Sequence, residues 1–263
     1  MDGAGRPLVY GGVGPSVVDY DNDGDLDVFV ANYGPNTMFR NDGGGLFTDA
    51  TIESGLAPPT LPFVGFGVAF LDADRDAALD LAIVNGHVID NTAVFRPGST
   101  HAQRKLLLRN TNGRRFIEIG QAAGAGFATD VVGRALVAGD VDNDGDVDMV
   151  VTTNGGAPEL LRNSSPGDRR ALLVRLRGRG SNSGALGSRV TVTAGGRTQV
   201  RDVKSGASYL GQHDLRVHFG LGQAAAIERL DVRWPGRQTE AVRDLAADHN
   251  LTMAEGQGVT PPQ

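Results

Sequence analysis

Short apolar runs alternate with polar turn residues along the chain, and three of these turns are rich in aspartate. The first turn, 19–27, is preceded by Ser16-Val17-Val18 and followed by Val28-Phe29-Val30. The turns at 72–80 and 140–148 have similar apolar flanks. Short β-branched runs on both sides of a turn predict buried strands rather than helices. We therefore expect three hairpins whose tips carry the aspartates.

A second signal follows each predicted hairpin: an apolar pair, then Arg-Asn, then turn residues. It occurs at Arg40-Asn41, Arg109-Asn110 and Arg162-Asn163. In the first two copies another strand with a phenylalanine follows, at 46–48 and 115–117. Each repeat therefore predicts a four-stranded antiparallel unit, and successive units of this kind are typical of a β-propeller. The second repeat also holds a long insertion between residues 86 and 103.

From residue 170 the pattern changes to alternating strands without a convincing helix. Apolar and polar residues alternate over 189–193, 198–203 and 227–234, and Gly195-Gly196 forms a turn between the first two. Several short strands of this kind predict a small β-sandwich or barrel. The sequence thus predicts an all-β protein with two domains and a tail. The predicted domains are residues 1–167 and 168–257, and the predicted disordered tail is 258–263.

Composition and charge narrow the function classes. The 263 residues include no cysteine, which excludes disulfides, thiolate catalysis and cysteine metal sites. The acidic excess lies in residues 1–167, whereas residues 168–263 are basic. Arg175, Arg177 and Arg179 alternate along a strand, which favours a solvated sheet face over nucleic-acid binding. No apolar stretch is long enough for a membrane span, and no signal-peptide pattern is visible.

The aspartate turns share one spacing, with Asp at positions 1, 3, 5 and 9 of a nine-residue loop. Carboxylates packed this densely repel one another unless a cation lies among them, and oxygen ligands at this spacing suit Ca²⁺. The alternative is that Asp, Asn and Gly simply gather in solvated turns, which three matching copies disfavour. The predicted metal ligands are Asp19, Asp21, Asp23, Asp25, Asp27, Asp72, Asp74, Asp76, Asp80, Asp140, Asp142, Asp144, Asp146 and Asp148.

The second loop departs from this pattern at two positions. Ala77 stands at position 6, where the other two loops have glycine, and Arg75 brings a positive charge into the loop. A side chain at a position that needs φ > 0 costs on the order of 1 kcal/mol. We therefore predict two strong Ca²⁺ sites and a weaker one at 72–80.

Several motifs resemble known families. Phe66-Gly67, the Asp-rich loops and the Arg-Asn turns resemble the FG-GAP or VCBS repeats of integrin α-chain propellers. Four ordered motifs in the basic half are similar to the ASPIC/UnbV domain; they lie at 181–190, 205–212, 218–222 and 232–236. The cartilage acidic protein family has this arrangement, in which FG-GAP repeats are followed by an ASPIC/UnbV domain. The resemblance implies a secreted, calcium-binding, non-enzymatic protein with a role in adhesion, built on an integrin α-like partial β-propeller of about three blades.

We expect an extracellular or periplasmic binding or scaffold module with structural Ca²⁺, whose partner is an extracellular protein or glycan. We also expect the chain to be an N-terminally incomplete fragment. The alternative is a polysaccharide-active hydrolase or lyase that uses the propeller face. Its candidate residues are His87 and His101 in the long insertion, but the sequence has neither an HExxH nor a GxSxG arrangement. The sequence therefore favours a role without catalysis.

Overall fold

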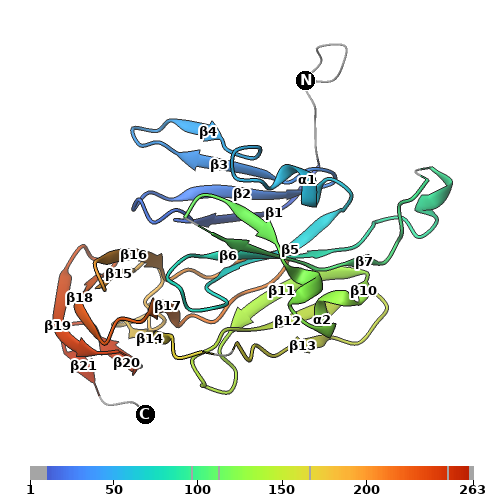
Figure 1. Cartoon of the computed structure of the whole chain (residues 1–263). Helices are drawn as coiled ribbons and strands as arrows, with labels where there is room; N and C mark the ends of the chain where they lie inside the picture. The colour runs from blue at the N-terminus through green and yellow to red at the C-terminus, as the bar shows by residue number, and fades with distance from the viewer. Residues whose placement is uncertain (1–10, 96, 112, 166, 248, 261–263) are drawn as a thin grey trace.

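The structure, a computed structural model, describes residues 11–95, 97–111, 113–165, 167–247 and 249–260. Nearly all of its regular elements are strands, as the sequence predicts. Three sheets from the first part of the chain lie side by side, and a two-layer sandwich from the last part lies against them (Figure 1). The helices are single turns: α1 (Ala57–Thr60), η1 (Thr92–Val94), η2 (Gly120–Ala122) and α2 (Ala125–Ala128). Within the described residues, no helix is both long and apolar enough to cross a membrane.

The first two sheets have four antiparallel strands each, in chain order, and we call them blades 1 and 2. Blade 1 consists of β1 (Gly12–Val18), β2 (Asp27–Asn32), β3 (Thr37–Asn41) and β4 (Phe47–Asp49). Blade 2 consists of β5 (Gly65–Leu71), β6 (Asp80–Asn85), β8 (Leu106–Asn110) and β9 (Phe116–Glu118). The strands β7 (Gln103–Arg104) and β10 (Asp130–Val131) pair with each other outside the blades. In both blades the Asp-rich turn joins the first two strands, which confirms the predicted hairpins.

Blade 3 corrects the sequence prediction of four strands per repeat. Within the described residues it has three strands, β11 (Gly133–Gly139), β12 (Asp148–Thr153) and β13 (Glu159–Leu161). The sequence after the third Arg-Asn turn holds no strand with a phenylalanine, and the chain instead enters the sandwich at β14 (Arg170–Arg177). The third repeat therefore ends as the connection to the next domain.

The blades pack on one another through apolar faces. Phe29 of blade 1 and Leu81 of blade 2 belong to one buried cluster, and Val84 of blade 2 and Leu136 of blade 3 belong to another. The inner strands β5 and β11 approach closely, because a Cβ on Gly67 would lie 2.4 Å from the Leu136 nitrogen. The Phe66-Gly67 signature thus marks a place where neighbouring blades meet closely.

The second domain is a sandwich of two four-stranded sheets. A sandwich is one of the two folds that the sequence predicts for it, the other being a barrel. The strand orders of the two sheets are β17-β14-β20-β21 and β16-β15-β18-β19. The new strands are β15 (Arg189–Ala194), β16 (Arg197–Asp202), β17 (Val217–Gly222), β18 (Ala226–Arg233), β19 (Thr239–Ala246), β20 (His249–Ala254) and β21 (Gly258–Thr260). Leu172 and Phe219 from the first sheet and Leu230 and Val232 from the second meet in one buried core.

The predicted disordered tail is wrong for residues 258–260, which form β21. This strand pairs with β20, with Thr260 opposite Thr252. The turn before β21 is held by Glu240, whose carboxylate accepts hydrogen bonds from the amides of Gly256 at 2.7 Å and Gly258 at 3.2 Å. Residues 261–263 lie outside the described part of the chain.

Candidate metal centres

Each Asp-rich loop gathers three carboxylates, from its first, third and ninth positions. One oxygen of each lies within 4.8 Å of the other two. The first and ninth aspartates are buried in all three loops, while the third is more accessible. The triads are Asp19, Asp21 and Asp27 in loop 1, Asp72, Asp74 and Asp80 in loop 2, and Asp140, Asp142 and Asp148 in loop 3. Three acidic clusters with metal-ligand spacing therefore recur at the same end of the three blades.

The first aspartate shapes each loop by accepting hydrogen bonds from the backbone. In loop 2 the Asp72 carboxylate accepts from the amides of Asp76 at 2.9 Å and Ala77 at 2.7 Å. Asp140 does the same in loop 3, from Asp144 at 3.2 Å and Gly145 at 3.1 Å. These bonds require the chain to turn back sharply. Positions 4 and 6 accordingly adopt positive φ in all three loops.

The ninth aspartate joins each loop to the Arg-Asn turn. The two Asp27 oxygens accept from the Tyr20 amide at 3.1 Å and the Asn41 amide at 2.8 Å. Asp80 and Asp148 repeat this arrangement, with the amides of Asn110 and Asn163 each at 2.8 Å. The sequence analysis missed this role for the asparagines, although their recurrence after each loop was the available signal.

The Asn side chains also connect neighbouring loops. The Asn110 amide group, in blade 2, donates to the Tyr20 carbonyl of loop 1 at 3.2 Å. In the same way Asn163 of blade 3 donates to the Ala73 carbonyl of loop 2 at 2.9 Å. Loops 1 and 2 are therefore each braced by the blade that follows.

Burial makes these carboxylates costly to ionise. It raises the pKa of Asp19 and Asp27 to about 6, that of Asp72 to about 7 and that of Asp80 to about 8. The pKa of Asp140 is also raised, again chiefly by burial. Removing a carboxylate from water penalises its charged form, and a nearby positive charge offsets that penalty. The triads are thus arranged so that a cation would stabilise them.

Arginines lie against the third-position carboxylates. Arg114 is 3.1 Å from Asp21, Arg169 is 2.9 Å from Asp74 and Arg162 is 2.5 Å from Asp142. Even so, Asp19 Oδ1 and Asp74 Oδ1 are buried without a hydrogen-bond partner. Such atoms are costly unless a ligand reaches them. An all-oxygen donor set with unsatisfied buried atoms fits a hard divalent cation such as Ca²⁺.

The other predicted ligands lie outside the triads. The fifth-position carboxylates of Asp23, Asp76 and Asp144 each accept from the backbone amide two residues later, at 2.9 Å. Asp25 is exposed, and Asp146 pairs with Arg75 at 3.2 Å. For these five residues a role as metal ligands stays a prediction.

The two histidines proposed for catalysis lie at the opposite end of blade 2 from the loops. His87 is buried, with Nε2 2.8 Å from the Tyr33 hydroxyl and Nδ1 accepting from the Ile89 amide at 3.0 Å. His101 contacts the Ile89 carbonyl through Nδ1 at 3.1 Å. Both rings therefore hold the long insertion in place.

Comparisons with known proteins agree with this division of the chain. A model of the FG-GAP-like repeat matches residues 19–83, and a model described as ASPIC and UnbV matches residues 178–260. The chain joins FG-GAP-like repeats to an UnbV domain. We therefore call the three blades the FG-GAP repeats, and the sandwich, residues 170–260, the UnbV domain.

Curated relatives include three cartilage acidic protein 1 sequences. The human protein is 30% identical over 149 residues, which are 56% of this chain and 20% of that protein. The Xenopus tropicalis protein is 31% identical over 142 residues, 53% of this chain and 19% of that protein. The mouse protein is 30% identical over 149 residues, again 56% and 20%. The chain spans about a fifth of the length of these relatives.

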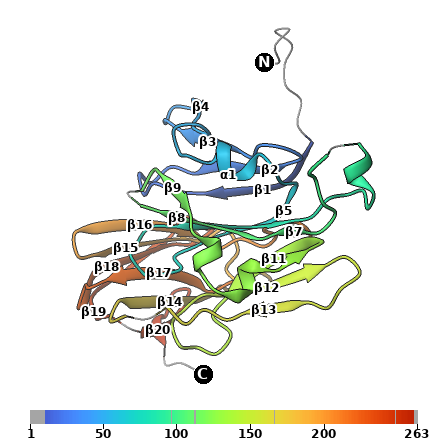
Figure 2. The same cartoon turned by 45° about the vertical axis from the view of Figure 1, so that its right-hand side comes forward.

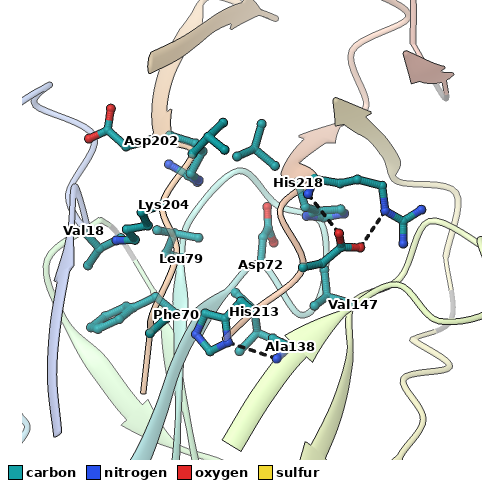
Figure 3. A pocket seen from close by; sticks show the side chains of 18 of the residues that line it. Val18, Phe70, Asp72, Leu79, Ala138, Val147, Asp202, Lys204, His213 and His218 are labelled. Atoms are coloured by element: carbon teal, nitrogen blue, oxygen red, sulfur yellow. Dashed lines mark hydrogen bonds and ion pairs between the residues drawn. The ribbon is translucent and has the colours of Figure 1, made fainter. Parts of the chain in front are cut away.

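A cavity of about 140 Å³ lies between the loops and the UnbV domain, next to their direct contacts. The first aspartates of all three loops line it, together with Arg201, Lys204, His213 and His218 of the UnbV domain. Asp72 points into this cavity, with Lys204, His213 and His218 around it (Figure 3). Burial lowers the pKa of both histidines to about 4, so they are neutral at pH 7. The acidic ends of the FG-GAP repeats thus face the basic UnbV domain.

Proposed function

We propose that the chain is a calcium-binding module in which Ca²⁺ has a structural role. The observation that carries this proposal is the same buried carboxylate triad in three successive blades, with Asp19 Oδ1 left without a partner. The first, third and ninth aspartates would hold the ion. Bound Ca²⁺ would supply the positive charge that offsets the repulsion among these carboxylates. Through the ninth aspartate and the Arg-Asn turn, an occupied site would join the hairpin tip to the third strand of its blade.

Calorimetric titration of the metal-depleted chain with CaCl₂ tests this role, with MgCl₂ as the matched control. We expect saturable Ca²⁺ binding and a rise in melting temperature. Ligand at about 100 times its dissociation constant stabilises a protein by about 2.7 kcal/mol per site. A chain that shows a folded β-sheet circular dichroism spectrum, but neither binding heat nor a shift in melting temperature, would overturn the proposal.

We further propose that the module acts outside the cell or in the periplasm, as an adhesion-type scaffold for a protein or glycan. The FG-GAP match and the cartilage named in its relatives support this location. Millimolar Ca²⁺ there would keep sites of modest affinity filled. Binding of the immobilised chain to panels of matrix proteins and glycans, with and without Ca²⁺, tests the proposal. Binding that ignores Ca²⁺ would separate partner recognition from the metal sites.

The proposed role is without catalysis. In support, the ring of His87 is committed to hydrogen bonds with Tyr33 and Ile89 that anchor the insertion. Activity on a polysaccharide panel that disappears in His87→Gln, while the melting temperature is retained, would restore the enzymatic alternative.

A further inference from the structure

The UnbV motif at 205–212 inserts its tip between two FG-GAP blades. The Ser208 hydroxyl accepts hydrogen bonds from the Val68 amide of β5 at 2.9 Å and the Leu136 amide of β11 at 3.4 Å. Beside it, Tyr209 packs edge-on against Phe66, with ring centroids 5.1 Å apart. The tip therefore contacts the inner strands of blades 2 and 3 at once.

The next UnbV motif along the chain, 218–222, lies directly on loop 2. A Cβ built on Gly220 would be 1.8 Å from Asp72 Oδ2 and 2.7 Å from the Arg75 Cα. Two residues later, the Gly222 amide donates to the Arg75 carbonyl at 2.9 Å. A carboxylate of the loop 2 triad thus packs against UnbV main chain, and only glycine leaves room for it.

Loop 3 is held by hydrogen-bond donors from the same strand and the turn before it. His218 Nε2 lies 3.0 Å from the Gly145 carbonyl. The Arg216 guanidinium donates to the Asp140 carbonyl at 2.6 Å and to Asn143 Oδ1 at 2.7 Å. Asn143 and Gly145 are the two positive-φ residues of this loop. The UnbV domain therefore fixes the part of loop 3 with the least common backbone conformation.

The sandwich packs against the end of the blades that carries the Asp-rich loops (Figure 2). Arg197 donates to the Asp76 carbonyl of loop 2 at 2.9 Å. Half-buried Arg201 attracts both Asp19 and Asp72, which lowers the pKa of Asp19 relative to burial alone. The UnbV domain thus meets the acidic loops with donors and positive charges, and in the described part of the chain each triad consists of loop aspartates alone.

We propose that the UnbV domain forms the outer half of metal sites 2 and 3, with Gly220, Arg216 and His218 as positioning residues. This inference rests on the proposed calcium binding. If docking of the domain orders these loops, docking and ion binding strengthen each other by the same factor, because linkage is reciprocal. Couplings of this kind are commonly about 5- to 150-fold in affinity. The UnbV domain is then a partner of the ions as well as of the blades.

Gly220→Ala tests the contact with Asp72, and Gly236→Ala is its control. Gly236 lies in the same domain with nothing within 4 Å of an added Cβ. Calorimetry on the full chain measures Ca²⁺ affinity. Hydrogen exchange at the Val68 and Leu136 amides, which Ser208 accepts from, reports docking independently. We expect Gly220→Ala to weaken at least one site about 5- to 150-fold and to speed exchange at both amides, whereas Gly236→Ala changes neither.

If Gly220→Ala does not fold, Ser208→Gly provides a second test of the coupling. Ser208 has a φ of 67°, so glycine preserves its backbone while removing the hydroxyl. We expect weaker Ca²⁺ binding from this change although residue 208 lies outside the loops. Faster hydrogen exchange at the Val68 and Leu136 amides with unchanged Ca²⁺ affinity would overturn the proposed coupling. It would not contradict the metal sites themselves. A wild-type chain that binds no Ca²⁺ would instead overturn the proposed function itself.

Discussion

Arg75 of loop 2 forms an ion pair with Asp146 of loop 3, with its Nε 3.2 Å from Asp146 Oδ1. The two side chains are only 13% and 9% exposed. The sequence places Arg75 among the carboxylates of its own loop, as a charge that competes with a cation there. In the structure its guanidinium leaves that loop and neutralises the next one. The residue therefore connects two metal loops.

Replacing Arg75 with Asn, the residue found at this position in loops 1 and 3, should destabilise the metal-free chain by about 1–3 kcal/mol, because Asp146 would lose a buried partner. Thermal melting in metal-depleted buffer measures the change. Arg162→Gln is the control, since the Arg162 side chain is 64% exposed and its pair with Asp142 should contribute about 1 kcal/mol or less. Equal effects from the two substitutions would contradict the prediction.

Loop 2 should gain stability from Ala77→Gly. Ala77 has a φ of 71°, where an L-residue pays about 1–2 kcal/mol that glycine avoids. Glycine also makes the unfolded chain more flexible, so a net gain of about 1 kcal/mol is expected in the melting curve. The reverse change in loop 3, Gly145→Ala at a φ of 90°, should destabilise by a similar amount. If Ala77→Gly left both melting and Ca²⁺ affinity unchanged, the predicted weakness of site 2 would have to come from charge alone.

Asp19 and Asp25 offer a matched pair within loop 1. Asp19→Asn removes a buried triad carboxylate and should abolish the Ca²⁺-dependent stabilisation of that loop, about 2.7 kcal/mol at 100 times the dissociation constant. Asp25→Asn changes an exposed carboxylate outside the triad and should leave most of that stabilisation in place. Melting curves at graded Ca²⁺ concentrations separate the two. If Asp25→Asn caused the larger loss of Ca²⁺-dependent stabilisation, the aspartate at the seventh position would be a metal ligand.

The metal-free chain should become less stable as the pH rises from 6.5 to 8. Asp72 and Asp80 have folded pKa values of about 7 and 8 against an ordinary 3.8, so the folded chain holds protons that the unfolded chain has released. Stability from these groups is complete below pH 4 and is lost as the pH passes their folded values. His213 and His218, with folded pKa values of about 4 against an ordinary 6.5, oppose this trend only slightly, through the protons that the unfolded chain still releases just above pH 6.5.

Ca²⁺ competes with those protons, so the rise in melting temperature that it causes should grow over the same pH range. Melting at pH 6.5, 7.2 and 8.0, with and without Ca²⁺, measures both trends. Asp80→Asn should flatten the fall of the metal-free melting temperature with pH, because it removes the carboxyl with the higher pKa of the two. A metal-free melting temperature that does not fall between pH 6.5 and 8 would show that these carboxylates are already ionised at pH 6.5.

The hairpins and the clustering of aspartates at their tips could be predicted from sequence because both depend on local spacing, whereas the sequence did not separate the three triad positions from the other aspartates. Asp27, Asp80 and Asp148 begin their strands as the apolar flanks indicate, and each ninth aspartate returns to its own first position. The direction of Arg75 depends on how blades 2 and 3 pack, which no local pattern encodes. The same holds for Ser208, whose partners lie 140 and 72 residues away along the chain. The fourth strand of blade 3 is predicted only by analogy with its neighbours, and the described part of the chain holds none there because it leads directly into the sandwich.

Ser208 has a consequence for the spacing of adjacent blades. Its hydroxyl reaches the inner strands of blades 2 and 3 together, so it fixes how far apart those strands stand. In a closed propeller, the angle between adjacent blades is set by how many blades share the circle, typically four to eight. A domain that fixes this angle restricts the number of blades that a propeller built from these strands can have.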